Sequence, residues 1–135
     1  MGTTDLIAHR YGFMSPAYLK QLEQADAAVG YLWRTLSESG LDQRYNLIVQ
    51  SDHGGRDHDH TTPHPEVLTI PWICSGPSSR KAYPIEGPVS ILDTAPTICR
   101  LMEVAHEHLP WEGRPLEQIL AVGKSEPAQA LWTTM

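Results

Sequence analysis

Apolar side chains recur at steps of three and four residues between Ser15 and Gly40, which predicts a long amphipathic helix. The Ser15 hydroxyl can accept a hydrogen bond from a free amide of the first turn, and Pro16 suits the first helical position. Gly40 ends the pattern and predicts the end of the helix. Residues 1–14 are polar and contain two glycines, so we expect them to form turns.

Two short apolar runs follow the helix, and each predicts a buried strand. The first covers residues 45–50 and the second covers residues 68–74, with a polar loop at residues 56–66 between them. Further along the chain, the pattern predicts a second helix at residues 91–104 and a short helix at residues 115–122. Helices and strands in this order, with polar loops at the strand ends, indicate an α/β fold.

The chain has 135 residues, which suffices for one hydrophobic core and is too short for two. We therefore expect a single domain over residues 1–135, with a frayed tail over about residues 124–135. No apolar run approaches the roughly 18 residues of a membrane helix. Cys74 and Cys99 indicate neither a disulfide framework nor a sulfur-ligated zinc site. These features leave the localisation open.

Acidic residues outnumber basic ones by 16 to 10, which gives a formal net charge of −6. This balance excludes a general basic surface for nucleic acid. An anionic substrate would need a local cation, and in an acidic protein a bound metal ion is the simplest source. Histidine and aspartate are therefore the residues to follow along the chain.

The most informative motif is Asp52-His53 followed by two glycines, directly after the first predicted strand. Functional loops of α/β sheets gather at such strand ends. Adjacent extended residues point to opposite sides, so the two side chains can reach two cations, and the glycines let the backbone turn close to a ligand. The alternative is that Asp52 caps the loop and His53 packs.

Two further clusters accompany this motif. Asp5 and His9 are four residues apart, a spacing that puts both side chains on one face of a helical turn or tight loop. His58, His60 and His64 follow the strand, interleaved with aspartates. Each cluster alone could be solvated polarity, but imidazoles beside carboxylates are typical ligands of zinc and related metals.

The order of these motifs resembles a known family, the type I phosphodiesterase/nucleotide pyrophosphatase branch of the alkaline phosphatase superfamily. The similar segments are Asp5-x-x-x-His9-x-Tyr11-Gly12, Asn46-x-Ile48-Val49-x-Ser51-Asp52-His53-Gly54, Thr69-Ile70-Pro71-Trp72-Ile73, Asp93-x-Ala95-Pro96-Thr97 and Glu112-Gly113-Arg114-x-Leu116. The resemblance covers about residues 1–120. It implies part of an alkaline-phosphatase-like sheet with flanking helices, and hydrolysis of phosphodiesters or phosphomonoesters by two-metal phosphoryl transfer.

The resemblance also implies a first metal site made of Asp5, His9 and His60. His58 and His64 are the competing candidates for the place of His60. The mixture of nitrogen and oxygen ligands favours Zn, with Mn or Fe as alternatives. The expected substrate is an anionic phosphate ester.

For a second metal site, the resemblance implies Asp52 and His53. The remaining ligands of this site and the Thr or Ser nucleophile belong to an N-terminal half in the family. We therefore expect the nucleophile upstream of Met1, a chain that is the C-terminal part of a longer enzyme, and little or no activity in isolation. An exposed sheet edge would favour self-association.

Other interpretations remain open from the sequence. Within the same superfamily, a sulfatase or a cofactor-independent phosphoglycerate mutase is an alternative. From a different class, the chain could be a non-catalytic metal-binding or interaction module.

Overall fold

The computed structural model describes residues 2–105 and 108–121. The chain divides into two compact units, Met1–Cys74 and Ser75–Met135. The tail expected at residues 124–135 lies outside the described residues.

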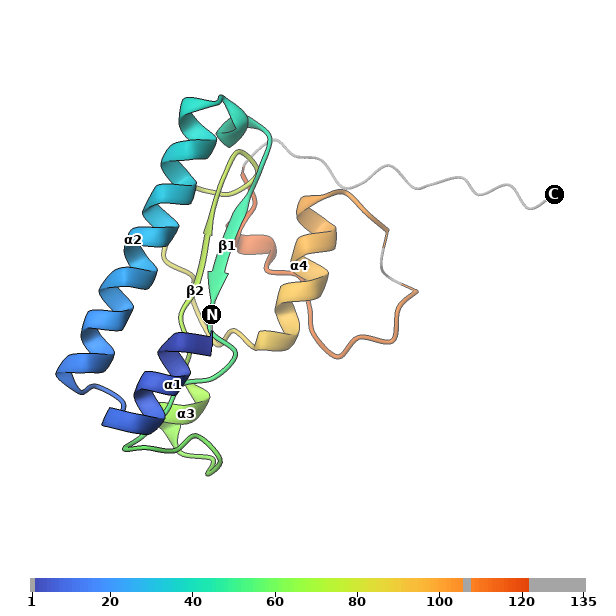
Figure 1. Ribbon diagram of the computed structural model, residues 1–135. Coiled ribbons are helices and arrows are strands. Elements are labelled where there is room, and N and C mark those ends of the chain that lie inside the picture. The colour runs from blue at the N-terminus through green and yellow to red at the C-terminus, as the bar shows by residue number, and fades with distance from the viewer. Residues whose placement is uncertain (1, 106–107, 122–135) are drawn as a thin grey trace. The chain divides into compact units, whose positions relative to one another are not determined.

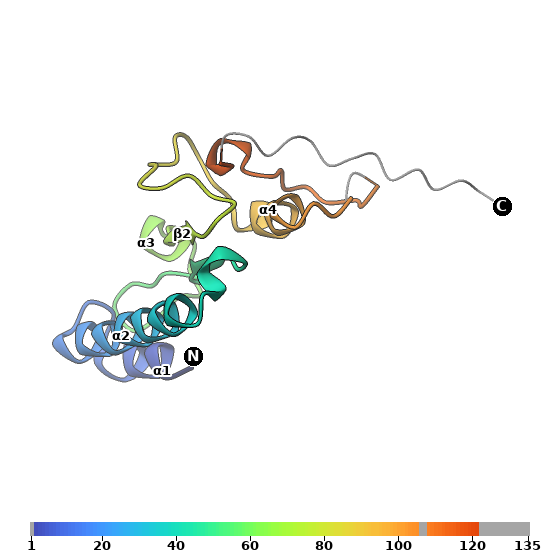
Figure 2. The same ribbon diagram turned by 90° about the horizontal axis from the view of Figure 1, so that it is seen from above.

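The first unit begins with two helices, α1 at Gly2–Tyr11 and α2 at Pro16–Glu38. The two helices lie side by side and contact each other (Figures 1 and 2). The expectation of turns over residues 1–14 was therefore wrong for most of that segment. The apolar pattern of α1 is weak, and Ala8 is the only buried residue in it. Because the sequence hardly indicates this helix, its stability depends on packing against α2.

The long helix α2 confirms the prediction from Ser15 onward. The Ser15 hydroxyl accepts a hydrogen bond from the Tyr18 amide at 3.2 Å, and Gly40 follows the helix with a left-handed φ of +69°. A single turn of 3₁₀ helix, Leu41–Gln43, then leads to the first strand. No helix in the described part of the chain combines the length and the hydropathy needed to cross a bilayer.

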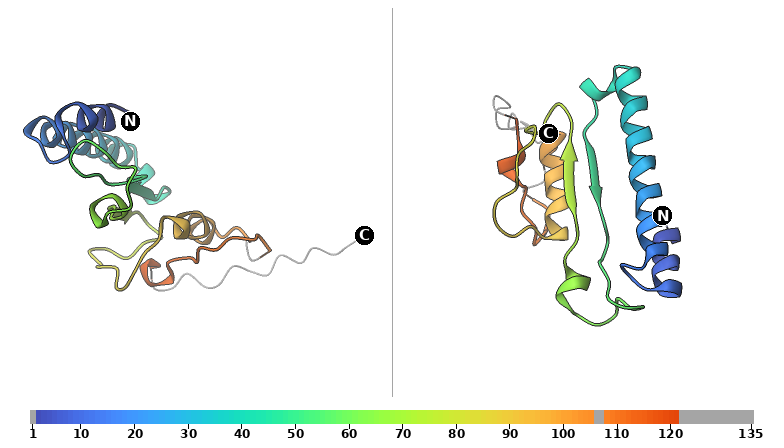
Figure 3. Two further views of the ribbon diagram at one scale, coloured as in Figure 1. Left: turned by 90° about the horizontal axis from the view of Figure 1, so that it is seen from below. Right: turned by 90° about the vertical axis from the view of Figure 1, so that its left-hand side faces the viewer.

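Two strands, β1 at Leu47–Gln50 and β2 at Trp72–Ser75, pair antiparallel in a two-stranded sheet (Figure 3). Both strands were predicted, but neither is fully buried, and Ile73 in β2 is 57% exposed. The short helix α3, Pro65–Leu68, includes Leu68, the residue at which the second strand was expected to begin. Pro65 occupies the start of that helix, where its missing N–H costs nothing.

The second unit contains a 3₁₀ turn at Ile91–Asp93 that runs into helix α4, Thr94–Leu101. The helix expected at residues 91–104 is thus confirmed in part: it ends at Leu101, three residues earlier than expected. Pro96 is tolerated because it lies in the first turn of α4. The helix expected at residues 115–122 is reduced to a 3₁₀ turn, Glu117–Ile119. Among the described residues of this unit, the buried ones are Ser78, Ser79, Pro96, Thr97, Leu101, Leu116 and Ile119.

Candidate metal centre

Helix α1 carries the first two side chains of the site. Asp5 and His9 are one helical turn apart, and the His9 Nε2 atom lies 3.5 Å from the Asp5 Oδ1 atom. The helical spacing of four residues places both groups on one face, as the sequence predicted. Ala8, beside His9, is completely buried, so this stretch of helix is fixed against the rest of the unit.

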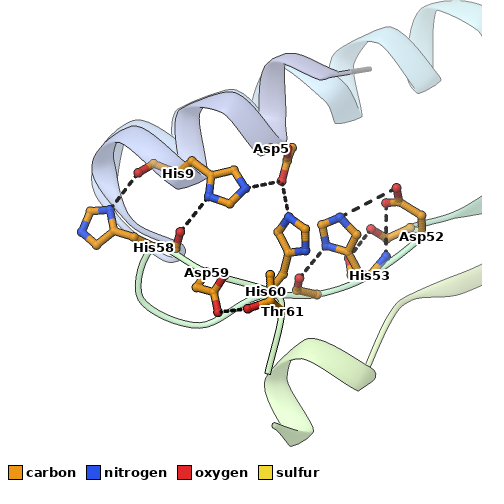
Figure 4. Close-up of polar contacts among 10 residues, drawn as sticks. Asp5, His9, Asp52, His53, His58, Asp59, His60 and Thr61 are labelled. Atoms are coloured by element: carbon orange, nitrogen blue, oxygen red, sulfur yellow. Dashed lines mark hydrogen bonds and ion pairs between the residues drawn. The ribbon is translucent and has the colours of Figure 1, made fainter. Parts of the chain in front are cut away.

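The loop after β1 brings a third side chain to the same point. His60 places its Nε2 atom 3.5 Å from the same Asp5 Oδ1 atom, and its ring centroid is 4.9 Å from that of His9. One ligand atom from each of Asp5, His9 and His60 lies within 4.8 Å of the other two (Figure 4). Residues more than 50 positions apart in sequence thus converge on one small volume.

The chemistry of this cluster fits a divalent cation. The Asp5 Oδ1 atom is buried and has no hydrogen-bond partner among the residues that the structure describes. His9 Nδ1 lies 2.7 Å from the His58 carbonyl oxygen, and because a carbonyl only accepts, Nδ1 carries the proton. In the neutral ring, Nε2 then presents a lone pair towards the Asp5 oxygen.

Two lone pairs facing each other repel unless a proton or a metal ion lies between them. Tetrahedral zinc ligands at about 2.0–2.1 Å from one ion stand roughly 3.4 Å apart. The two nitrogen-to-oxygen separations of 3.5 Å in the cluster match this spacing. All three ligand atoms lie within 4.8 Å of one another, so Asp5, His9 and His60 form a compact set that could hold one metal ion.

Asp52 and His53 lie beside this cluster but outside it (Figure 4). The Asp52 carboxylate accepts a hydrogen bond from the His53 amide at 3.1 Å, and its other oxygen is 3.8 Å from His53 Nε2. His53 Nδ1 donates to the Gly54 carbonyl at 2.8 Å, which leaves Nε2 free to act as a ligand. The Asp52 side chain is 87% exposed and that of His53 is 29% exposed.

The two glycines after His53 allow a close approach of backbones. The Gly54 amide donates to Val67 and the Gly55 amide to Glu66, at 2.7 and 3.0 Å, which ties the loop to α3. A Cβ on Gly54 would lie 2.0 Å from the Glu66 carbonyl oxygen, and one on Gly55 would lie 2.1 Å from the Phe13 ring. Neither glycine has a positive φ, so close packing, rather than a special turn, requires them.

The structure places the two competing histidines elsewhere. His64 precedes α3, with its Nδ1 atom 3.5 Å from the Arg56 guanidinium. The His58 ring lies at the end of α1, where its Nδ1 atom is 3.0 Å from the His9 carbonyl oxygen. Among the described residues, His60 is the loop histidine that groups with Asp5 and His9.

A tight turn shapes the loop between these histidines. The backbones of Arg56 and Asp59 exchange two hydrogen bonds of 2.9 and 3.0 Å, and Asp57 between them has a φ of +52°. A hydrogen bond from the Thr61 hydroxyl holds the pKa of the Asp59 carboxyl below its usual value. Asp57 takes the left-handed position of this turn, a conformation that aspartate tolerates better than most residues other than glycine.

Known proteins are similar to part of the chain. The chain is 43% identical over 53 residues to human ectonucleotide pyrophosphatase/phosphodiesterase family member 7 (Homo sapiens), which covers 39% of the chain and 12% of that protein. It is 42% identical over 50 residues to family member 1 of Mus musculus, covering 37% of the chain. It is 38% identical over 50 residues to venom phosphodiesterase 2 of Crotalus adamanteus, again covering 37% of the chain.

These matches span 12% of the length of the first relative and 6% of each of the other two. No solved structure matches the chain. The family model described as type I phosphodiesterase / nucleotide pyrophosphatase matches residues 2–73, more than half of the 135 residues. That segment includes the candidate ligands Asp5, His9, Asp52, His53 and His60. The match confirms the resemblance inferred from the motifs: the chain belongs to the type I phosphodiesterase/nucleotide pyrophosphatase family.

Proposed function

We propose that this chain carries the metal centre of a hydrolase that cleaves phosphate esters, with phosphodiesters as the main substrate class. In this proposal Asp5, His9 and His60 hold one divalent ion, and Asp52 and His53 contribute to a second. The surrounding fold is alkaline-phosphatase-like. Zn is the preferred metal because imidazole and carboxylate ligands in a compact set suit it, with Mn or Fe as alternatives.

One observation carries the proposal. The buried Asp5 Oδ1 atom has no hydrogen-bond partner among the described residues, and it lies 3.5 Å from both imidazole Nε2 atoms. The Asp5 side chain is 44% exposed, but this oxygen is shielded from water, and a cation held between it and the two nitrogens would satisfy it. The family membership supports the same interpretation, because its named relatives are phosphodiesterases and nucleotide pyrophosphatases.

The proposed ligands differ in charge, and each kind contributes differently to the site. Bound divalent ions lower the pKa of a hydroxyl or water ligand and offset the charge of phosphoryl oxygens. Asp5 supplies one negative charge to the first site, while His9 and His60 supply neutral nitrogen ligands whose orientation the protein fixes. With a net charge of −6, the chain otherwise repels an anionic ester, so these two sites are where its phosphate would bind.

The proposal is tested by titrating Zn²⁺ into the metal-free chain in competition with a chromogenic chelator. We expect about one tight equivalent, because one site has three ligands in this chain and the other has two. Asp5→Asn and His60→Ala should each weaken it at least about 100-fold. His108→Ala, an exposed histidine in the second unit, is the matched control and should leave the affinity unchanged.

Hydrolysis of bis(p-nitrophenyl) phosphate is measured on the same samples. Turnover that a chelator abolishes and that Asp5→Asn removes supports the hydrolase. Tight Zn²⁺ binding without any turnover supports the metal site and matches the expectation that this chain alone has little or no activity, so it fits both the hydrolase and the non-catalytic metal-binding alternative. A wild-type chain that binds no Zn²⁺, or binds it equally well after Asp5→Asn, overturns the metal site.

A further inference from the structure

We propose that His58 is a positioning residue for the metal centre: its ring fastens the loop to the end of α1, so that its own carbonyl oxygen fixes the tautomer of His9. The inference rests on the proposed metal-binding function. It assigns to His58 a task that is different from binding the metal itself.

The two histidines are joined by a reciprocal pair of hydrogen bonds. His9 Nδ1 is 2.7 Å from the His58 carbonyl oxygen, and His58 Nδ1 is 3.0 Å from the His9 carbonyl oxygen (Figure 4). Carbonyl oxygens cannot donate, so each Nδ1 atom must carry the proton. His9 is thereby held as the tautomer with a free Nε2 lone pair, the form that binds a metal.

The His58 ring also completes the end of α1. The last carbonyl groups of a helix have no partner within it, and His9 lies in the last turn of this one. The His58 N–H satisfies one of these carbonyls, as basic side chains do at helix C-termini. A single side chain thus closes the helix and anchors the loop that bears His60.

Backbone contacts around Gly12 support the same connection. The Phe13 amide donates to the Asp57 carbonyl at 2.6 Å, next to the His58 hydrogen bonds. Gly12 has a φ of +95°, and a Cβ there would meet the Asp57 oxygen at 3.4 Å and the His58 ring at 3.6 Å. The chain that leaves α1 and the turn around Asp57 are therefore packed directly against each other.

The geometry separates His58 from the metal ligands. Its Nδ1 atom donates to the His9 carbonyl. His58 does not belong to the group of Asp5, His9 and His60, whose ligand atoms lie within 4.8 Å of one another. Figure 4 shows the His58 ring at the far side of the His9 backbone from Asp5. Removing a group that orients a histidine ligand typically weakens metal binding about 10–100-fold.

Amide side chains provide a specific test of this role. The Asn Nδ2 atom is as many bonds from the backbone as His Nδ1, so His58→Asn can still donate to the His9 carbonyl. The amide nitrogen of His58→Gln lies one bond further out and matches His Nε2 instead. A positioning role predicts rescue by Asn and not by Gln, whereas a metal ligand acting through Nε2 gains nothing from Asn.

The experiment measures Zn²⁺ affinity by chelator competition for the full 135-residue chain and its variants. We expect His58→Ala and His58→Gln to lose about 10–100-fold in affinity. His58→Asn should stay within about threefold of wild type, as should the control His64→Ala from the same loop. A loss below threefold in His58→Ala, or an equal loss in His58→Asn, overturns the inference.

A second readout needs no metal. In ¹⁵N-detected NMR spectra of the metal-free chain, His9 should be a single tautomer protonated at Nδ1 in wild type and His58→Asn, and a mixture in His58→Ala. A wild-type His9 protonated at Nε2 overturns the inference even if Zn²⁺ binds. Failure of wild type to bind Zn²⁺ overturns the proposed function, while the tautomer still decides whether His58 orients His9.

Discussion

The imidazole rings of His53 and His60 stack on each other, with centroids 3.8 Å apart and ring planes inclined by 19°. Each ring also has a second anchor: His53 donates to the Gly54 carbonyl at 2.8 Å, and His60 lies 3.5 Å from Asp5 Oδ1. The two rings belong to the two different sets of proposed metal ligands. The stack therefore connects the two sets, so that neither ring can turn without disturbing the other.

A double-mutant cycle measures this connection. Stacked aromatic pairs contribute about 0.5–1.5 kcal/mol beyond their buried area, and residues in contact are not additive. We expect His53→Ala and His60→Ala to show a coupling energy of about 0.5–1 kcal/mol in urea unfolding of the metal-free chain. The matched cycle of His53→Ala with His64→Ala should be additive, and additivity in both cycles would contradict the stack.

Alanine at the two glycines after His53 should be tolerated differently. At Gly54 the new Cβ meets backbone, which cannot move aside, whereas at Gly55 it meets the Phe13 ring. Overpacking of this kind costs about 1–3 kcal/mol or more. We expect Phe13→Ala to relieve part of the cost of Gly55→Ala and none of the cost of Gly54→Ala.

Urea unfolding of the single and double variants checks this difference. Gly2→Ala is the control, because nothing lies within 4 Å of its Cβ position. Equal, additive effects of Phe13→Ala in the Gly54→Ala and Gly55→Ala backgrounds would show that the ring is not what requires glycine at position 55.

Elements with local sequence signals were predictable. Helix α2 has a hydroxyl cap at Ser15, a proline at its start and a regular apolar pattern, and all three act over a few residues. Helix α1 has no such signals, and it depends on contacts with α2 that the sequence does not reveal. The strand expected from residue 68 begins at Trp72 because the preceding segment folds as α3.

The grouping of residues in the candidate site was also predictable only where a local sequence signal exists. The spacing of Asp5 and His9 indicated that they share one face of a helical turn or tight loop. Their assignment as ligands, and the preference for His60 over His58 and His64, came from the family resemblance. The loop follows no regular period, so the direction of each ring depends on the turn between Arg56 and Asp59 and on its hydrogen bonds to α1. The orienting contact between His58 and His9 crosses 49 positions and has no signature in the sequence.

Tyr18, in the first turn of α2, should make the first unit sensitive to alkali. Burial raises the pKa of its phenol above the usual value of 10.0. The unfolded chain therefore releases this proton first, so stability is intact below about pH 10 and falls as the pH rises through the folded-state pKa.

Absorbance at 295 nm follows the ionisation of the five tyrosines. Tyr18→Phe should remove the component that titrates last and should lessen the loss of stability above pH 10. Tyr31→Phe, at a tyrosine that is 69% exposed, should change neither. Removal of the last component by Tyr31→Phe instead would contradict the assignment.

The contribution of Thr97, in α4, to the stability of the protein should come more from its hydroxyl than from its methyl group. The side chain is completely buried, and its hydroxyl donates to the Asp93 carbonyl at 2.6 Å and accepts from the Leu116 amide at 3.0 Å. Thr97→Val keeps the shape but leaves the buried Leu116 N–H without this partner, at a cost of about 1–3 kcal/mol. Thr97→Ser keeps both hydrogen bonds and loses one methyl group, which costs about 1 kcal/mol.

In unfolding experiments, Thr97→Ser should therefore be more stable than Thr97→Val. Side-chain hydrophobicity alone predicts the reverse order. Thr35→Val, which removes an exposed hydroxyl on α2, is the control and should stay within about 0.5 kcal/mol of wild type. If Thr97→Val were the more stable of the two, the hydroxyl would not be what joins α4 to the segment around Leu116. In that case packing of the methyl group alone would account for the burial of Thr97.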